Sequence, residues 1–212
     1  MDQYRAPDSI VIHPSILYFG TPVVLISTRN ADGSTNITPM SSAWALADRV
    51  VIGLAAGGQG VANLQREREC VLNLASEDLQ EATERMAPTT GSDPVPDWKQ
   101  VNGYRHVADK FALAGLHAVA SHEVSAPRIA ECPLQLEARV ALMVERPVDD
   151  WRHGPGGYVI AELQVLRVHA HEDIVVPGTQ HIDPVRYQPL FYLFRHYVGR
   201  GTGLGKTFKA EV

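Results

Sequence analysis

The residues best suited to chemistry begin with five small or rigid residues that follow an apolar stretch. They are Thr38, Pro39, Met40, Ser41 and Ser42. Pro39 fixes the backbone and lacks an N–H group, and the short side chains around it leave neighbouring backbone N–H groups accessible. A flat, polar ring can therefore lie along the main chain here and accept hydrogen bonds from it. The same residue types also suit an ordinary connection between two strands, because they are common in turns.

A second stretch is rich in glycine and lies between an expected strand and a short helix. Its residues are Gly57, Gly58, Gln59 and Gly60, and Asn63 follows within the helix. The first N–H groups of a helix have no partner within it, and the helix dipole is positive at that end, so a phosphate group fits there. The alternative is a flexible turn that only begins the helix. A dinucleotide fingerprint is excluded, because the Gly-x-Gly-x-x-Gly spacing and a surrounding βαβ unit are both missing.

A glycine cluster near the C-terminus imitates a nucleotide-binding loop. Gly205-Lys206-Thr207 copies the end of the P-loop motif, but Arg200 stands where its first glycine belongs. No βαβ unit can follow so near the last residue, so the P-loop interpretation is rejected. Two alternatives remain. In the first, four residues of this tail reach a ligand pocket across a dimer: Arg195, His196, Tyr197 and Arg200. In the second, the tail only docks on the fold.

Two histidines raise the question of a metal. His169 and His171 share one face of an expected strand, with Glu172, Asp173 and His181 nearby. Zinc needs three or four converging ligands, and the pattern supplies no dependable third, so no metal site is predicted. A Gly-x-Ser-x-Gly elbow is also missing, which leaves a serine hydrolase unsupported and no catalytic side chain assigned.

Alternating and continuous apolar runs predict a fold built mainly from strands. The expected strands are 21–28, 34–38, 50–54, 70–74, 134–140 and 159–168. The pair Asp32-Gly33 predicts a tight turn between the first two strands, and 149–157 is the expected hairpin connection between the last two. Long strands with few, short helices indicate a closed antiparallel barrel in place of a βαβ sheet.

Two short helices and one long irregular segment complete the expected elements. The helices are predicted at 60–69 and 78–85. Residues 86–101 contain several prolines and a glycine, which argues against regular structure. A segment of this length is either a lid or binding loop, or a tether that runs over the surface.

Composition places the chain among compact proteins of a reducing compartment. Its 212 residues, 45% hydrophobic and 20% charged, fit a single domain with a C-terminal extension over about 175–212. The net charge of −5 argues against a nucleic-acid partner, and no apolar run approaches the ~20 residues that cross a membrane. Cys70 and Cys132 are too few for a disulfide framework, and Met1–Arg5 lacks the apolar core of a signal peptide. We therefore expect a cytoplasmic protein.

The order and spacing of several motifs resemble the flavin reductase-like, FMN-binding split-barrel family, which includes the flavoredoxins. The matching stretches fall within roughly residues 15–170 and are 36–42, 50–54, 62–64, 70–74, 109–111, 114–116 and 131–137. The resemblance implies a mainly β, antiparallel, Greek-key-like split barrel with short helices. It also implies a homodimer in which each subunit binds FMN near the subunit interface.

The resemblance further assigns expected roles to individual residues. Residues 38–42 would line the isoalloxazine ring and the ribityl chain, and 57–63 would enclose the phosphate. Lys110 is the expected cationic partner of the phosphate, and Phe111 a wall of the pocket. The alternative for Lys110 is a solvated lysine at a helix start. The expected cofactor is FMN, with FAD as the variant, and NAD(P)H is the expected co-substrate.

Two departures from the family pattern bear on function. Family members carry a hydroxyl residue before the short helix, where this chain has Gly60, which puts the phosphate affinity and the identity of the flavin in question. NAD(P)H-dependent members carry Gly-Asp-His before their last long strand, where this chain has Gly154-Pro155-Gly156-Gly157-Tyr158. The resemblance thus implies an FMN-binding oxidoreductase that performs NAD(P)H-linked flavin reduction or another FMN-dependent redox step. The alternatives are a non-enzymatic flavin carrier or electron-transfer protein reduced by a partner, and a split barrel that has changed its ligand.

Overall fold

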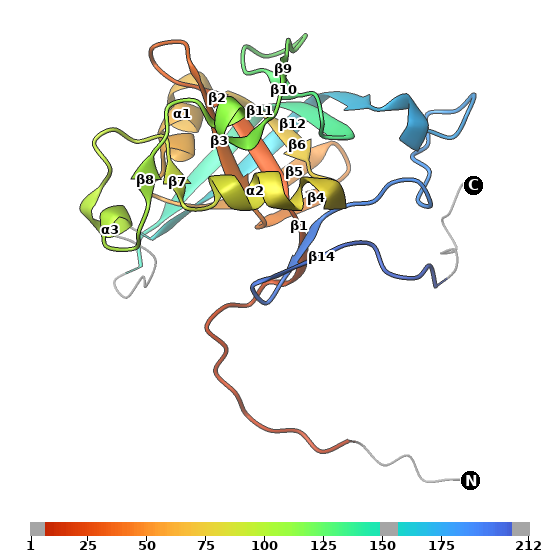
Figure 1. Cartoon of the computed structure of the whole chain (residues 1–212), viewed down its shortest axis with the longest axis horizontal. Coiled ribbons are helices and arrows are strands. Elements are labelled where there is room, and N and C mark those ends of the chain that lie inside the picture. Colours follow the sequence, from red (N-terminus) through yellow and green to blue (C-terminus); the bar gives the residue numbers. More distant parts are fainter. Residues whose placement is uncertain (1–6, 149–156, 205–212) are drawn as a thin grey trace.

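A seven-stranded antiparallel sheet forms the body of the protein in the computed structural model, which describes residues 7–148 and 157–204 (Figure 1). Its strands are β2 (Val24–Arg29), β3 (Thr35–Met40), β4 (Ala43–Leu46), β5 (Arg49–Ala55), β6 (Glu69–Leu74), β11 (Leu134–Arg146) and β12 (Tyr158–Ala170). Their order is β3-β2-β6-β11-β12-β5-β4, so strands distant in sequence lie side by side. The prediction of a mainly β, antiparallel fold is confirmed.

Small sheets and short helices surround this body. β1 (Phe19–Pro22) pairs with β13 (Phe191–Leu193), which pairs with β14 (His196–Val198). The other two small sheets join β7 (Thr89–Thr90) to β8 (Arg105–His106), and β9 (Ala118–Val119) to β10 (Arg128–Ile129). The helices are α1 (Gln59–Glu67), α2 (Gln80–Met86), α3 (Asp97–Gln100) and α4 (Lys110–Ala114), with 3₁₀ turns at Glu77–Leu79 and Glu172–Ile174. Across the described ranges, no helix has the length and apolar character to span a membrane.

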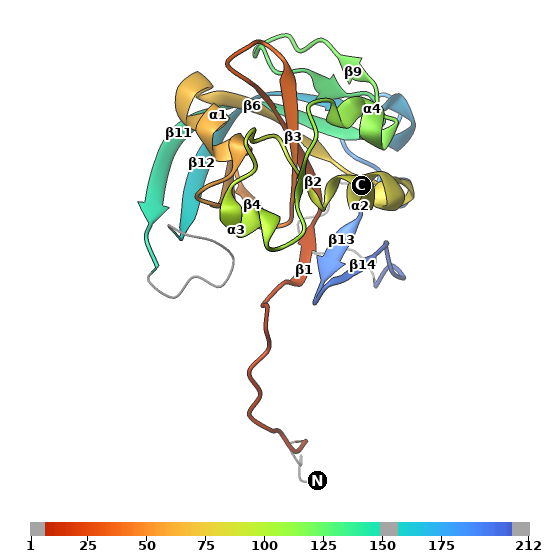
Figure 2. The same ribbon diagram turned by 60° about the vertical axis from the view of Figure 1, so that its left-hand side comes forward.

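The continuous apolar run of β2 is explained by burial on both faces of the strand. Val24 and Ile26 face one core cluster, which contains Leu64 of α1, whereas Val23 and Leu25, just before and within the strand, face a second cluster beneath α2 and α4. All four side chains are at most 3% exposed. The sheet is therefore covered on one side by α1 and on the other by α2 and α4 (Figure 2).

The strand predicted at 21–28 is in fact two strands, which is a correction. β1 ends at Pro22 and pairs with β13, while β2 begins at Val24 and pairs with β3 and β6. Val23 lies between them, donating its N–H to the Leu190 carbonyl and accepting from the Ala75 N–H. Pro22 has no N–H to continue a ladder, which accounts for the change of sheet at this point. The turn predicted at Asp32-Gly33 is confirmed, with Gly33 at a φ of +82°.

Pro39 does not end its strand, contrary to the prediction. β3 continues to Met40, and Pro39 is paired with Leu25 of β2. β3 is an edge of the seven-stranded sheet, where proline is tolerated because one side of the strand needs no ladder hydrogen bonds. The Ile37 carbonyl faces that open side, since it accepts a hydrogen bond from Lys110, and Pro39 two residues later faces the same way.

The helix predictions hold with small shifts, and the two late strands are longer than predicted. The helix predicted at 60–69 is α1, and the one predicted at 78–85 is a 3₁₀ turn followed by α2. β11 and β12 have 13 residues each and pair along almost their whole length. Of the hairpin connection expected at 149–157, residues 149–156 lie outside the described residues.

An extended arm precedes the first strand. Residues 7–17 leave the body of the protein as a chain without helix or strand (Figure 2). Ile10, Val11 and Ile12 are 87%, 89% and 65% exposed, and Leu17 is 70% exposed. Consecutive exposed aliphatic residues on an unpaired segment are a feature of surfaces that contact another molecule.

Candidate functional site

One cavity of about 1060 Å³ brings together most of the residues that the sequence selected. Its walls come from the C-terminal half of β3, the end of β5, the start of α1, helix α2, the segment 87–104, the start of α4 and the β13–β14 hairpin. The predicted residues that line it are Thr38, Pro39, Met40, Ser41, Gly58, Gln59, Gly60 and Lys110. Two motifs separated in sequence by the strands β4 and β5 thus share one cavity, because β3 lies against α1.

Four other predicted residues do not line the cavity but support it. Ser42 hydrogen-bonds through its hydroxyl to the Tyr18 hydroxyl at 2.8 Å. A Cβ atom on Gly57 would lie 3.4 Å from the Trp98 ring, so the ring stands directly in front of this glycine. Phe111 packs against the core cluster under α2 and is not among the residues that line the cavity.

Asn63, the fourth, is a structural residue. It is fully buried, and its side-chain amide donates to Thr28 Oγ1 at 2.9 Å and to Asn30 Oδ1 at 2.8 Å. These bonds tie α1 to the β2–β3 hairpin and so fix the direction in which the helix start points.

Two glycines make room for a polar pair at the deep part of the cavity. Asn36 Nδ2 donates to Thr38 Oγ1 at 3.0 Å, and both side chains lie on β3. A Cβ atom on Gly60 would lie 2.5 Å from Thr38 Oγ1, and one on Gly91 would collide with Asn36 Oδ1. Asn36 is 2% exposed, and its Oδ1 has no hydrogen-bond partner in the described part of the chain. Position 60 must therefore be glycine because a side chain from β3 occupies the space in front of it.

The start of α1 faces the cavity with free backbone donors. The Val61 and Ala62 N–H groups both bond to the Gly58 carbonyl. The Gln59 and Gly60 N–H groups have no acceptor among the residues described. The helix has nine residues and no acidic residue in its first turn, so its positive end is not neutralised there.

Two buried lysines line the same cavity. Lys110 is 3% exposed and donates from Nζ to the Ile37 carbonyl at 2.7 Å. Lys99 is 9% exposed, donates to Thr90 Oγ1 at 3.0 Å, and lies 5.2 Å from the Trp98 ring centre. In the described ranges neither lysine is paired with a carboxylate. A buried cation without an anionic partner is costly, so these two lysines indicate that an anion belongs here.

The electrostatics of the pair agree with this interpretation. Burial, together with the neighbouring charge of Lys99, lowers the pKa of Lys110 from 10.5 to about 8. Burial also lowers the pKa of Lys99. The alternative of a solvated lysine at a helix start is therefore wrong for Lys110.

The segment 86–101 is a wall of the cavity and not a distant tether. Thr89, Thr90, Gly91, Trp98 and Lys99 line the cavity, and Tyr104 follows just after the segment. Lys99, Thr90, Trp98 and Tyr104 belong to no motif that would predict them from the sequence. The signal available was a lysine beside a tryptophan inside a long irregular segment, which has no fixed spacing from the other motifs.

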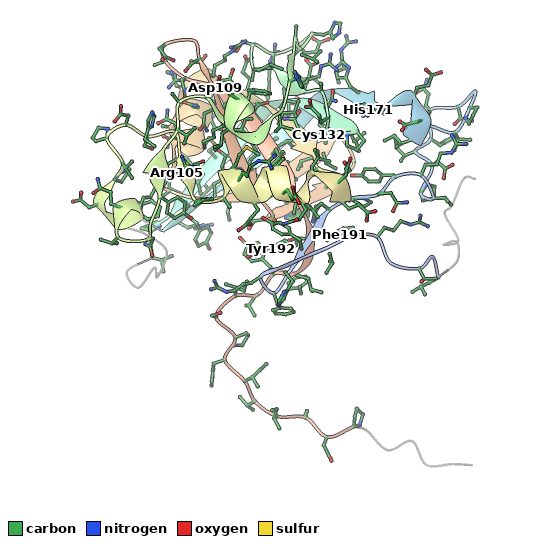
Figure 3. All side chains as sticks on the ribbon, viewed as in Figure 1. Arg105, Asp109, Cys132, His171, Phe191 and Tyr192 are labelled. Carbon is green, nitrogen blue, oxygen red and sulfur yellow. The ribbon has the colours of Figure 1, made fainter. Side chains whose placement is uncertain are left out.

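The opposite part of the cavity is aromatic and carries one carboxylate. The Tyr197 hydroxyl donates to Glu84 Oε2 at 3.2 Å, and the rings of Tyr18 and Tyr192 meet edge to face at 5.3 Å. Burial raises the pKa of Tyr197, and Glu84 adds to this effect. Figure 3 places Tyr192 and Asp109, the residue before Lys110, on opposite sides of α2. The cavity therefore passes along α2, between a cationic part and an aromatic part.

The C-terminal residues belong to this site in part. Arg195 and Tyr197 line the cavity, as one of the two predicted alternatives has it, whereas His196 and Arg200 do not. Arg200 donates instead to the Val185 carbonyl. Residues 205–207 of the glycine cluster lie outside the described residues.

The two histidines considered for a metal have protein partners. His169 Nε2 lies 2.6 Å from Glu137 Oε1, and His171 Nε2 lies 2.9 Å from the Ala130 carbonyl. Within the described residues, no group of three or more His, Cys, Asp or Glu side chains converges as metal ligands do.

Comparisons with known proteins place this geometry in a family. The model of the "Flavin reductase like domain" matches residues 16–200. YdfE of Bacillus subtilis (strain 168), an uncharacterized protein, is 42% identical over 200 residues, which cover 94% of this chain and 93% of YdfE.

Solved structures show the same fold at low sequence identity. Flavoredoxin of Desulfovibrio vulgaris (Miyazaki F) has a TM-score of 0.75 at 18% identity, covering 96% of this chain and 99% of that one. A candidate flavin reductase with a split barrel domain from Shewanella frigidimarina NCIMB 400 has a TM-score of 0.67 at 16% identity, covering 90% and 87%. The predicted split-barrel fold is confirmed, and the chain belongs to the flavin reductase-like family.

Proposed function

We propose that this protein binds FMN in the cavity and acts as an oxidoreductase, by NAD(P)H-linked flavin reduction or another FMN-dependent redox step. The observation that carries the proposal is the buried pair Lys99 and Lys110, which lines a cavity of about 1060 Å³ without a carboxylate partner. FMN is a planar ring with a dianionic phosphate, and it suits a cavity that has a cationic part and a flat wall. FAD is the alternative flavin, since Arg195 adds a cationic group to the same cavity at the β13–β14 hairpin.

Three features of the cavity near the start of α1 suit the phosphate of FMN. The Gln59 and Gly60 N–H groups are free at a helix start, two lysines lie close by, and Gly60 and Gly91 leave the space uncovered by side chains of their own. Unpaired N–H groups at a helix start and cationic side chains are the donors that bind phosphate in other proteins.

We place the flavin ring along Pro39–Ser41 and the end of β5. Met40, Leu54 and the Tyr104 ring supply apolar surface, and Gly53 and Ala55 allow close approach to the backbone of β5. When bound, FMN supplies the hydride chemistry, and the protein supplies position and charge. The side chains of the cavity bind and orient the ring, and no side chain of this chain is assigned to the chemical step.

We further propose that the protein is a homodimer and that the arm 7–17 takes part in the contact between subunits. Pro14–Tyr18, at the base of the arm, line the cavity, while Ile10, Val11 and Ile12 extend into solvent. Replacing Ile10, Val11 and Ile12 with serine should convert the dimer to a monomer, measured by light scattering on a sizing column. A serine variant that keeps the mass of the unchanged protein would exclude the arm from the contact.

Cys70 and Cys132 are free and buried thiols, which supports our proposal of a cytoplasmic location.

The first experiment is the visible absorption spectrum of the purified protein after incubation with FMN and desalting. Retained flavin bands are expected. NADH and NADPH oxidation with FMN would then be followed in the steady state. Flavin retention without turnover with either nucleotide would favour a flavin carrier or electron-transfer protein. If the protein neither retains flavin nor turns over NADH or NADPH, the proposed function is wrong.

A further inference from the structure

The place in front of Gly60 is taken by a hydroxyl group from another strand. A Cβ atom on Gly60 would lie 2.5 Å from Thr38 Oγ1, which is closer than any real contact, so residue 60 and Thr38 compete for one position. We propose that Thr38 supplies the side-chain hydroxyl that binds the phosphate of FMN at the start of α1. This inference rests on the proposed FMN binding, and it moves Thr38 from the ring wall to the phosphate.

The hydrogen-bond pattern leaves the Thr38 proton available. Asn36 Nδ2 donates to Thr38 Oγ1 at 3.0 Å, so the oxygen already serves as an acceptor. A hydroxyl group has one proton to donate, and no acceptor for it exists among the described residues. A phosphate oxygen placed in the cavity is a strong acceptor for that proton.

Asn36 holds the hydroxyl in this orientation. Its side chain is 2% exposed and fits against the Gly91 backbone, where no Cβ atom could be accommodated. The amide cannot swing away without vacating a closely packed position. The pair of glycines, one on α1 and one beside β7, therefore shapes the space for one oriented hydroxyl group.

Each of the two lysines bonds to a residue next to Thr38 or next to Gly91. Lys110 donates to the carbonyl of Ile37, the residue directly before Thr38. Lys99 donates to Thr90, which directly precedes Gly91. The Thr38 hydroxyl thus shares one cavity with the free N–H groups of α1 and two buried ammonium groups, which together form the donor set of a phosphate dianion.

The test compares FMN with riboflavin, which has the same ring and ribityl chain but no phosphate. The dissociation constants of both are measured by flavin fluorescence quenching for the unchanged protein and for Thr38→Val, Thr38→Ser and Ser41→Ala. Thr38→Val should weaken FMN binding roughly 10- to 100-fold, as expected for a hydrogen bond to a charged group, and leave riboflavin binding unchanged. Thr38→Ser should retain FMN binding. Ser41→Ala removes a different hydroxyl of the same cavity and should leave the ratio of the two constants unchanged.

A double variant moves the hydroxyl to the other side of the same space. In Thr38→Ala/Gly60→Ser the small residue on β3 makes room for a side chain at the start of α1, and the preference for FMN over riboflavin should return. If Thr38→Val weakens FMN and riboflavin equally, or weakens neither, the inference is wrong. The single variant Thr38→Ala is measured beside it, and a double variant that prefers FMN no more than Thr38→Ala does would also contradict the inference. Binding of neither flavin by the unchanged protein would instead overturn the proposed function itself, and this inference with it.

Discussion

Lys110 Nζ donates a 2.7 Å hydrogen bond to the Ile37 carbonyl and so ties the first residue of α4 to the open edge of β3. The bond crosses 73 residues of sequence and uses one of the three protons of the ammonium group. The other two protons have no carboxylate acceptor in the described part of the chain. This geometry holds a cation beneath the strand that carries Thr38, where it can act on a bound anion.

Replacing Lys110 with methionine should weaken FMN binding by roughly 10- to 100-fold and riboflavin binding much less, because a buried charge-assisted hydrogen bond to the phosphate is lost. The dissociation constants of FMN and riboflavin are measured by fluorescence titration. Arg105→Gln removes an exposed cation outside the cavity and serves as the control. An equal effect of both substitutions would show that only the general charge of the protein matters.

FMN binding should weaken as pH rises through about 8. The pKa of Lys110 is lowered from 10.5 to about 8 by burial and by Lys99, so the side chain loses its proton in this range while the phosphate stays dianionic. The stability of the ligand-free protein should change in the opposite direction. Between about pH 8 and 10.5 the unfolded chain binds a proton that the folded one has released, so the contribution of Lys110 to unfolding free energy rises with pH.

The variant Lys110→Met is the control for the pH dependence of FMN affinity. In Lys110→Met the pH dependence of FMN affinity between pH 7 and 9.5 should largely disappear, as measured by titration at constant ionic strength. Persistence of the same dependence in this variant would assign it to another group.

Trp98 should report flavin binding directly. Its side chain lines the cavity, so a bound flavin would quench its emission. The tryptophan fluorescence of the unchanged protein should fall on FMN addition, and Trp98→Phe should abolish most of that change. Trp44→Phe replaces a tryptophan that is 58% exposed and does not line the cavity, so it should keep the response. Quenching that survives in Trp98→Phe would mean that FMN binds elsewhere.

Glu137 should be a main source of acid sensitivity in the fold. Burial by itself raises the pKa of this carboxyl, but hydrogen bonds from the His122 and Glu123 N–H groups and from His169 outweigh it and hold the pKa below 4.5. A carboxyl with a lowered pKa stabilises the folded state above its unfolded pKa, and this contribution is lost as pH falls through the lowered value. Urea unfolding should show Glu137→Gln about 1–3 kcal/mol less stable at pH 7, with a smaller difference near pH 3. A difference that does not depend on pH would indicate a packing effect and not a charge effect.

The sequence by itself determined the longer strands of the main sheet and the local motifs. The apolar run at Val23–Ser27, the turn at Asp32-Gly33 and the alternation after Leu134 each depend on neighbours a few residues away, so their patterns are visible in one dimension. The same holds for the glycine-rich helix start at Gly58–Gly60, which faces the cavity where the motif predicts a phosphate.

Only the tertiary structure decided which of these residues meet. Asn63 and Phe111 suit a ligand by residue type, yet Asn63 is hydrogen-bonded to Thr28 and Phe111 packs on the core. Lys99 belongs to no motif, yet it lines the cavity because of the way the 86–101 segment folds. The requirement for glycine at position 60 likewise depends on a hydroxyl 22 residues earlier in the chain. Contacts of this kind arise because β3 is an edge strand whose open side faces α1 and α4, and no local pattern encodes which elements lie across such an edge.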